Sequence, residues 1–370
     1  MNFLRPSSAA TWIVCHGQPA MCEHFPNGTD EADDDVREDG IACHWLAAQV
    51  YAGNYPQPNS ISPNGRVLTD EMFDAVDVYL DVLRAWRGKA HVEMPIKANA
   101  IYPNMAGTPD AFYLDHKTNT LHIADLKYGF RFVEVWFNWQ LICYIAMVIE
   151  WFGLNDLMLT IVATIVQPRS YHREGPVRTW RIAAHSLRPY INDLTHAAAK
   201  AMQPEPSCTP NPGCTDCAAR HACVALQNSA LTAVETSYAG VPLELSPQAV
   251  GDELRRLKDA AKKLDARITG LQTQAEALLR AGMVIPHWTL APTYACERWR
   301  DGMESQVVRL GQHYNVELAK PIRPISPTQA RKLLPADIVA TYSHKPSTGM
   351  KLTKQDPYEV KKKFQSTTTE

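Results

Sequence analysis

Apolar side chains recur along the 370-residue chain with two different periods, which separate predicted helices from predicted strands. Helical spacing predicts helices at residues 39–51, 69–83, 137–152 and 186–202. Runs of β-branched and apolar residues predict strands at residues 91–94, 111–114, 121–124, 159–166 and 180–182. The order helix, three strands, helix, strand predicts an α/β fold in which helices flank a mixed β-sheet.

Changes in composition divide the chain into three predicted parts. A segment rich in proline and polar residues at 203–213 ends the α/β core, which we expect over residues 1–202. A cysteine-rich segment over residues 203–240 is expected to close onto the N-terminus. Residues 241–370 are expected to form a helical accessory region. Inside the first part, residues 1–36 are predicted to be irregular, with a solvated acidic loop at 30–35.

Residues 246–280 keep a 4-3-4-3 spacing of apolar positions, which predicts one long helix of about four heptads. Two interpretations fit this pattern. The helix forms a coiled coil, for self-association or for docking a partner protein, or it packs against the rest of its own chain. Farther on, the pattern predicts a strand at 288–291 and a helix that begins at Ser326, followed by a proline at its first position.

The bulk composition narrows the class of protein. A net charge of −2 does not mark the whole molecule as a nucleic-acid binder, so any basic groove must be local. The chain has no apolar run of the roughly 18 residues that a membrane span needs, and its start lacks the pattern of a signal peptide. We therefore expect a cytoplasmic protein without a membrane partner. In that compartment its nine cysteines are expected to be metal ligands or buried thiols rather than disulfides.

The chemistry suggested by the sequence centres on two aspartates and a lysine. Asp125 and Lys127 are two residues apart on a predicted strand, so their side chains point to the same face. Asp110 arrives from the neighbouring strand. Burying two carboxylates and an ammonium is costly unless they are used, and such a set suits Mg²⁺ or Mn²⁺ in phosphodiester hydrolysis. The alternative is a surface hairpin with solvated charges.

A short signature links these residues to a known superfamily. Pro109-Asp110, fourteen intervening residues and then Asp125-Leu126-Lys127 resemble the signature of the PD-(D/E)XK nucleases. Gly40 with His44 upstream, and Gln140 with Tyr144 downstream, resemble the RecB-like branch, including uncharacterised phage-encoded members. The resemblance implies a restriction-endonuclease-like core, His44, Asp110 and Asp125 as metal ligands, Lys127 as the catalytic lysine, and Gln140 and Tyr144 on the substrate side. Some relatives carry an acid on the preceding strand, where this chain has Glu93.

The cysteine spacing Cys214-x2-Cys217-x5-Cys223 is similar to that of RecB-like exonucleases of the CRISPR-associated type, which have an iron–sulfur cluster. The resemblance implies a 4Fe–4S cluster held by these three cysteines and Cys15, clasping the start of the chain to the end of the core. Two alternatives stay open: a local set completed by Cys208, holding iron–sulfur or Zn²⁺, or free thiols. The other cysteines lack partner spacing, and they are Cys22, Cys43, Cys143 and Cys296.

Taken together, the sequence predicts a metal-dependent DNA exonuclease, phage- or prophage-encoded, that acts on single-stranded or duplex ends in recombination, replication or repair. Basic and aromatic residues near the core could line a groove for a DNA strand: Lys97, Lys127, Arg131, Trp136, Trp139, Arg169, Tyr171 and Arg173. One alternative is a catalytically silent DNA-end or protein-binding module on the same scaffold. Another is a zinc-stabilised structural protein with a coiled-coil arm that docks a partner.

Overall fold

The computed structural model describes residues 4–25, 31–170, 172, 174–236 and 246–290. Residues up to Thr289 belong to one unit. The predicted helix at Ser326, Cys296, Tyr171 and Arg173 lie outside the described residues. Among the described helices, none combines the length and apolar character needed to cross a membrane.

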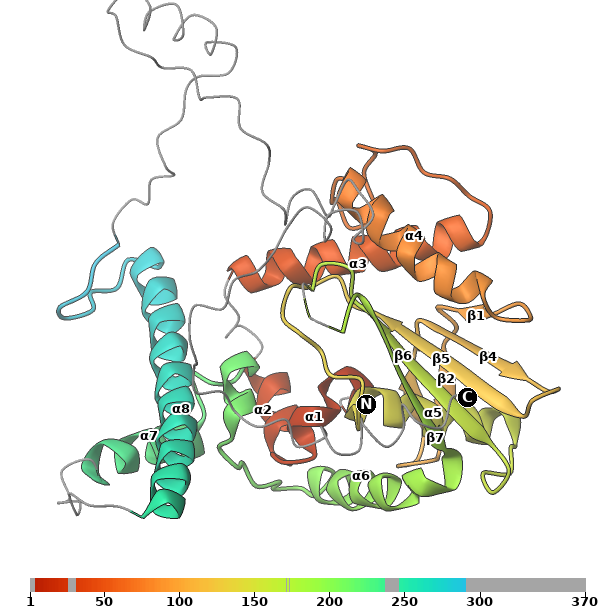
Figure 1. The fold of residues 1–370 in the computed structure, drawn as a ribbon. Helices are drawn as coiled ribbons and strands as arrows, with labels where there is room; N and C mark the ends of the chain where they lie inside the picture. The colour runs from red at the N-terminus through yellow and green to blue at the C-terminus, as the bar shows by residue number, and fades with distance from the viewer. Residues whose placement is uncertain (1–3, 26–30, 171, 173, 237–245, 291–370) are drawn as a thin grey trace, which may run out of the picture. The chain divides into compact units, whose positions relative to one another are not determined.

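A five-stranded mixed sheet forms the centre of this unit, with strand order β1-β4-β5-β6-β7 (Figure 1). Its strands are β1 (His91–Val92), β4 (Ala111–Asp115), β5 (Thr120–Leu126), β6 (Thr160–Val166) and β7 (Val177–Ala183). Strand β4 is antiparallel to both β1 and β5, β6 runs parallel to β5, and β7 is antiparallel to β6. The predicted fold class, a mixed sheet flanked by helices, is confirmed.

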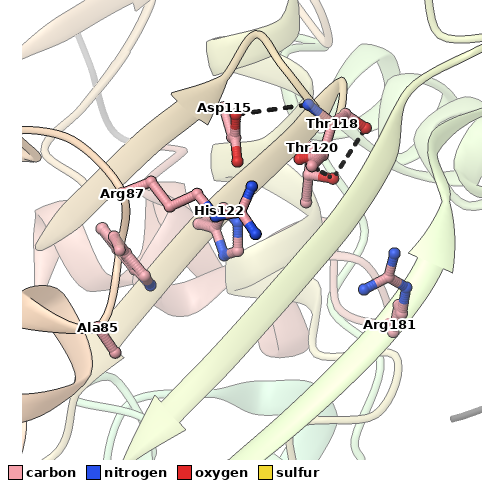
Figure 2. Close-up of a pocket in the computed structure, with 8 residues that line it drawn as sticks. Ala85, Arg87, Asp115, Thr118, Thr120, His122 and Arg181 are labelled. Atoms are coloured by element: carbon pink, nitrogen blue, oxygen red, sulfur yellow. Dashed lines mark hydrogen bonds between the residues drawn. The ribbon is translucent and has the colours of Figure 1, made fainter. Parts of the chain in front are cut away.

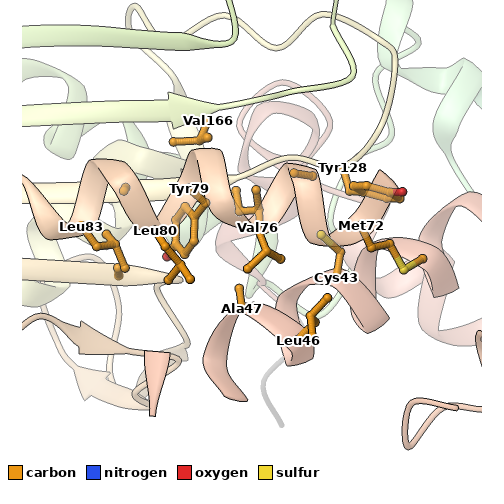
Figure 3. Close-up of a cluster of buried hydrophobic side chains, with 14 of the residues drawn as sticks. Cys43, Leu46, Ala47, Met72, Val76, Tyr79, Leu80, Leu83, Tyr128 and Val166 are labelled. Atoms are coloured by element: carbon orange, nitrogen blue, oxygen red, sulfur yellow. The ribbon is translucent and has the colours of Figure 1, made fainter. Parts of the chain in front are cut away.

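Two helices, α3 (Glu31–Tyr51) and α4 (Asp70–Arg84), pack over one face of the sheet (Figure 3). Helix α4 begins where the Thr69 side chain accepts a hydrogen bond from the Met72 amide (3.3 Å). Its apolar stripe contributes Val76, Tyr79 and Leu80 to a cluster with residues at the ends of the strands. This cluster lies beneath the residues of the candidate site and fixes the position of α3 against the sheet.

Helix α5 (Trp139–Phe152) packs against the other face and is buried nearly all round, as a helix inside a core must be. It begins at Asn138, whose side chain accepts hydrogen bonds from two backbone amides, and it ends at Gly153 in a left-handed conformation (φ 65°). On this face the ring of Phe112 lies 5.9 Å from those of both Trp151 and Phe152. Helix α6 (Arg188–Ala201) follows a short 3₁₀ turn, η2 (Ala184–Leu187), and packs beside α5.

The N-terminal segment is more ordered than its sequence predicts. It contains η1 (Pro6–Ser8), α1 (Ala9–Trp12) and α2 (Gln18–His24) where irregular structure was expected. The prediction of a solvated loop at 30–35 is also wrong for residues 31–35, which begin α3. Carboxylates near a helix N-terminus are favoured by the partial positive charge there, so an acidic run suits a helix start as well as a loop.

The region before β4 also differs from the prediction. The strand expected at 91–94 ends at Val92, because Glu93 adopts a left-handed backbone conformation (φ 47°) that a strand cannot accommodate. Two further strands, β2 (Ile96–Ala98) and β3 (Met105–Gly107), pair with each other in a separate antiparallel sheet. Strands of three residues carry too little periodicity to be recognised in a sequence.

The C-terminal part of the described chain contains η3 (Pro212–Asp216), α7 (Val224–Thr236) and the long α8 (Pro247–Arg280). Helix α8 packs closely through Gly270, where an added Cβ would lie 2.8 Å from the His221 amide nitrogen. Several heptad positions face solvent, with Leu257 59% and Ile268 52% exposed, whereas Leu254 and Leu264 are partly buried. The helix therefore packs on its own chain around Ala266 and Gly270, and part of the predicted seam stays exposed. Residues 288–290 form no strand, and Trp288 makes an isolated bridge to Ile285.

Candidate active site

Three ligand-bearing side chains converge where α3 crosses the edge of the sheet. His44 projects from α3, Glu93 follows β1, and Asp110 immediately precedes β4. The His44 Nδ1 atom lies 3.1 Å from Glu93 Oε1 and 3.4 Å from Asp110 Oδ1. One ligand atom from each of the three residues lies within 4.8 Å of the other two. One nitrogen and two carboxylate oxygens at this separation could share a single divalent ion such as Mn²⁺ or Mg²⁺.

The backbone holds Glu93 in this set at a conformational cost. A positive φ is uncommon for a residue with a side chain, and such strain persists only where the surrounding structure imposes it. Here the Glu93 amide donates to the Asp110 carbonyl (3.0 Å), which ties the end of β1 to the start of β4. From the sequence, Glu93 is a weaker candidate than the two aspartates, whereas in the structure its carboxylate contacts His44.

Asp110 is buried and oriented by its neighbours. Its Oδ2 atom accepts a short hydrogen bond from the Leu126 amide (2.6 Å), which leaves Oδ1 facing His44. Burial alone would raise the pKa of Asp110, but the charge and hydrogen bond of His44 and the charge of Lys127 lower it below the usual value. At His44, burial alone would lower the pKa. The charges and hydrogen bonds of Asp110 and Glu93 outweigh this effect and raise the pKa of His44 well above 6.5. The carboxylate of Asp110 is thus ionised and available as a ligand.

The second carboxylate, Asp125, lies at the end of β5 with only 1% of its surface exposed. Lys127 Nζ lies 3.0 Å from its Oδ2, and Gln140 Nε2 donates to its Oδ1 (3.0 Å). Gln140 Oε1 in turn accepts from Lys127 Nζ (2.9 Å), so the three side chains form a closed ring of contacts. Burial, partly offset by Lys127, raises the pKa of Asp125 to about 6. The predicted grouping of these residues across two elements is present, although Asp125 contacts Lys127 and Gln140 rather than His44.

Tyr144 lies one helical turn after Gln140 on α5 and is 7% exposed. Its ring packs against Gly107, where an added Cβ would lie 3.0 Å from Cε1 of the tyrosine. Burial, followed by the nearby charges of Asp110 and Asp125, raises the pKa of its hydroxyl. Tyr144 therefore stays neutral and supports the face of α5 that carries Gln140.

A cavity of about 630 Å³ opens beside these residues. It is lined by side chains and backbone of α3, Glu93 and the end of β5: Arg37, Gly40, Ile41, His44, Trp45, Ala48, Glu93, Leu126, Lys127 and Tyr128. Gly40 and His44, which the family resemblance pairs, thus line the same cavity. His44 and Glu93 are accessible from this side, and Lys127 contributes a positive charge to the wall.

The family of the chain follows from comparison with known proteins. A family model described as "Protein of unknown function (DUF2800)" matches residues 2–357. The chain belongs to the DUF2800 family. Among solved structures, a protein from Eubacterium rectale that carries a provisional exonuclease name matches with a TM-score of 0.33 and 9% identity, over 66% of this chain and 91% of that one. A protein named SSO0001 matches with a TM-score of 0.26 and 11% identity, over 50% of this chain and 95% of that one. Both TM-scores are too low to decide fold or function.

In this DUF2800 member, the side chain of Gln167 holds the loop between β5 and α5 in place. Gln167 is 1% exposed, and its side chain donates to the carbonyls of Gly129 (2.8 Å) and Arg131 (2.7 Å). Its Oε1 atom accepts from the Val133 amide (3.1 Å) and from Arg178 (2.8 Å). One glutamine therefore fixes the path of the chain directly after Lys127. The sequence marked the Gln-Pro-Arg segment but not this role.

The residues predicted to line a DNA groove lie in different surroundings. Arg169 lies over the rings of Tyr128 and Phe130 and pairs with Glu71 at 3.3 Å. Arg131 is exposed and forms an ion pair with Asp216, and Lys97 is exposed on β2. The prediction that the tryptophans face a DNA strand is wrong for Trp136, which is 9% exposed and packs against Trp180. Trp139 packs against Tyr190. These two rings contribute to the packing between α5 and its neighbours.

The cysteines of the N-terminal and 203–240 segments meet in one place. A small cavity is lined by Cys15, Cys208, Cys214, Cys217 and Cys223. Cys22, which the sequence left without a partner, has its Sγ 3.7 Å from that of Cys217. By contrast, Cys43 and Cys143 are buried apart from this set, and burial raises the pKa of Cys43 to about 12. The convergence of thiols from two distant segments is therefore present, with six cysteines where the resemblance implies four.

The thiols interact pairwise, and this alters their acidity. A hydrogen bond from Cys208 lowers the pKa of Cys15 to about 7 and that of Cys223 to about 6. A hydrogen bond from Cys217 likewise lowers the pKa of Cys22 to about 6. Burial raises the pKa of Cys214, and the hydrogen bond with Cys22 raises that of Cys217. The thiolate is the form that binds metals.

Close backbone contacts surround the sulfurs. The Thr209 amide donates to Cys15 Sγ and the Asn211 amide donates to Cys214 Sγ, both at 3.3 Å. Gly17 approaches the same region so closely that an added Cβ would lie 2.5 Å from Cys208 Sγ. Backbone amides directed at sulfur stabilise thiolates, as expected of a metal or cluster site.

Proposed function

We propose that this DUF2800 chain is a metal-dependent nuclease that hydrolyses phosphodiester bonds at DNA ends. The observation that carries the proposal is the convergence of His44, Glu93 and Asp110 beside the buried Asp125–Lys127–Gln140 ring. Two buried carboxylates at the ends of adjacent strands, with pKa shifts in opposite directions, are typical of functional sites. The open cavity beside them gives a strand access.

The residues divide the chemistry between them. His44, Glu93 and Asp110, joined by Asp125, would hold Mg²⁺ or Mn²⁺, which when bound supplies Lewis acidity toward the phosphate and its attacking water. Lys127 is held by Asp125 and Gln140 with its ammonium toward the acids, where it can orient a water and stabilise negative charge in the transition state. Gln140 keeps that ammonium in place, and Tyr144 supports the helix face that carries Gln140.

Point variants test this assignment. Asp110→Asn and Lys127→Ala are expected to lower cleavage of a labelled oligonucleotide by about 100-fold or more, because each removes a ligand or a transition-state contact. The matched control is Lys117→Ala, an exposed lysine in the turn between β4 and β5. DNA binding by the inactive variants, measured by fluorescence anisotropy, should persist. Full activity in Lys127→Ala would contradict the assignment. The same assay on 5′- and 3′-labelled, single- and double-stranded substrates distinguishes end-directed from internal cleavage.

A catalytically silent DNA-end or protein-binding module is the second candidate, favoured by the tight pairing of Lys127 with Asp125 in the described conformation. It predicts DNA or partner binding with no cleavage under any divalent metal.

We further propose that Cys15, Cys214, Cys217 and Cys223 hold a 4Fe–4S cluster, with Zn²⁺ as the alternative. The shared cavity and the amide–sulfur contacts support a bound group. An anaerobic preparation should be brown, with absorbance near about 400 nm and matching iron and sulfide contents. A colourless protein that contains zinc would contradict the cluster.

The fourth ligand can be assigned by substitution. Because Cys22 contacts Cys217 and Cys208 contacts Cys15, both compete with Cys15 for that place. Comparing the metal content of Cys15→Ala, Cys22→Ala and Cys208→Ala identifies the residue whose loss empties the site.

The exposed heptad face of α8 supports a partner contact through residues 246–280, either with a second copy or with a recombination protein. Light scattering on the full chain and on Leu257→Lys distinguishes these cases. A dimer that the substitution converts to a monomer indicates self-association, and a monomer in both samples contradicts it.

A further inference from the structure

A cavity of about 210 Å³ lies on the sheet at the far end of β5 from the candidate active site (Figure 2). It is lined by eight residues: Ala85, Trp86, Arg87, Asp115, Thr118, Thr120, His122 and Arg181. Thr120 begins β5 and Asp125 comes five residues later, which at about 3.3 Å per residue separates the two places by roughly 17 Å. The cavity is therefore distinct from the metal ligands.

The register of the sheet builds the floor of this cavity. Tyr113 pairs with His122, His122 with Val162, and Val162 with Arg181, so these four side chains form one row on the same face. Thr120, two residues before His122, points to that face as well. On this face α4 covers the other end of the strands, and the row lies beyond its last residue, Arg84.

Two arginines give the cavity its charge. Among the described residues, neither Arg87 nor Arg181 has a side-chain hydrogen bond or a close ion pair, although the charge of Arg87 helps to lower the pKa of Asp115 in the same cavity. The carboxylate of Asp115 is occupied in the hairpin turn, where Oδ1 accepts from the Lys117 (2.9 Å) and Thr118 (3.4 Å) amides. Figure 2 shows Arg87 lying across β5 beside His122 and Arg181 projecting from β7. The cavity is thus suited to an anion.

Aromatic rings form one wall. The Trp86 ring lies nearly parallel to that of Tyr113, 6.3 Å away at 18°, and 5.6 Å from His122. The chain after Trp86 is held tightly, because a Cβ on Gly88 would lie 2.4 Å from Cε2 of Tyr113. Only glycine allows this approach, which keeps Trp86 and Arg87 at the rim. A flat ring in a cavity that also contains two guanidinium groups suits a base attached to a phosphate.

We propose that this cavity binds a nucleoside monophosphate, with Arg87 and Arg181 on the phosphate and Trp86 against the base. Its volume is below the roughly 300–1,000 Å³ of sites for drug-sized ligands, which favours a small ligand whose base lies across the open side. A continuous DNA strand is disfavoured because α4 packs on the same face between the cavity and the metal ligands. Binding of the nucleotide in this cavity would not depend on cleavage of DNA at the metal site.

Calorimetric titration of the full chain in EDTA, which keeps divalent metal from the active site, tests the proposal. The probes are 2′-deoxyadenosine 5′-monophosphate and inorganic phosphate, and the nucleotide is expected to bind more tightly. Arg181→Ala should weaken both probes by about tenfold or more, because it removes charge-assisted hydrogen bonds. The control Arg84→Ala, an exposed arginine outside the cavity, should change neither.

Substitutions of Trp86 separate the base from the phosphate. Trp86→Ala should weaken the nucleotide by about fivefold or more and leave inorganic phosphate unchanged. Trp86→Phe, which keeps a ring and guards against a folding defect, should retain most of the affinity. Absence of nucleotide binding, or binding that Arg181→Ala leaves intact, would overturn the proposal. If Trp86→Ala left the affinity for both probes unchanged, the assignment of a nucleoside would be overturned.

Discussion

Glu93 combines a strained backbone with a carboxylate in contact with His44. A left-handed conformation costs a residue with a Cβ about 1–2 kcal/mol, whereas glycine adopts it freely. The surrounding contacts nevertheless hold Glu93 there, with its amide bonded to the Asp110 carbonyl. The strain is therefore consistent with a residue kept for its side chain rather than for local stability.

Substitutions at Glu93 should separate stability from metal binding. Glu93→Gly is expected to be more stable than Glu93→Ala by about 1 kcal/mol, because only glycine is free of the conformational cost. Urea unfolding measures this difference. Both variants should bind Mn²⁺ about tenfold or more weakly, as monitored by electron paramagnetic resonance. Unchanged Mn²⁺ affinity in both would remove Glu93 from the ligand set.

The sequence was sufficient to find the residues that carry local signals. Asp110, Asp125 and Lys127 follow from a short signature, and the two-residue spacing of Asp125 and Lys127 correctly places them together. Glu93 was a weaker candidate, because its importance depends on the turn after β1. No spacing pattern marks Cys22, whose contact with Cys217 arises from tertiary structure over 195 residues of chain.

At the scale of elements, Gln167 links β6 to the loop between β5 and α5. Strand β6 itself was predictable, because a run of β-branched residues between turns is typical of a buried strand. The loop was not, because its path depends on side-chain hydrogen bonds rather than on periodicity. The same holds for β2 and β3, and for the face through which α8 packs.

Replacing Gln167 should loosen this loop. In Gln167→Ala the buried carbonyls of Gly129 and Arg131 and the Val133 amide lose their partner, and we expect a loss of about 2–3 kcal/mol in the free energy of unfolding. Gln203→Ala, an exposed glutamine after α6, is the control. Equal stability of the two variants in urea would show that the loop does not depend on Gln167.

At the scale of the whole molecule, the thiols join the two ends of the α/β core. The Thr209 amide bonds to Cys15 Sγ across 194 residues of chain. A bound group that bridges these segments would restrict the unfolded chain, and closing a loop of this length stabilises the folded state by about 5 kcal/mol in the simple entropic treatment.

Loss of the bridging group should therefore destabilise the core as a whole. Cys217→Ser is expected to lower the midpoint of thermal unfolding by several degrees, measured anaerobically by calorimetry. Cys143→Ser would be a poor control because that thiol is buried in α5, so we choose the substitution of an exposed residue of α7, Gln227→Ala. Identical midpoints for Cys217→Ser and the parent protein would mean that nothing bridges the thiols.

The central claim, that His44, Glu93 and Asp110 serve a metal-dependent nuclease, is tested most directly by incubating the purified chain with an end-labelled oligonucleotide and increasing Mn²⁺. We predict progressive shortening of the strand that requires the metal and stops on addition of EDTA. An intact oligonucleotide at every concentration of Mn²⁺, Mg²⁺ and other divalent metals would contradict the account.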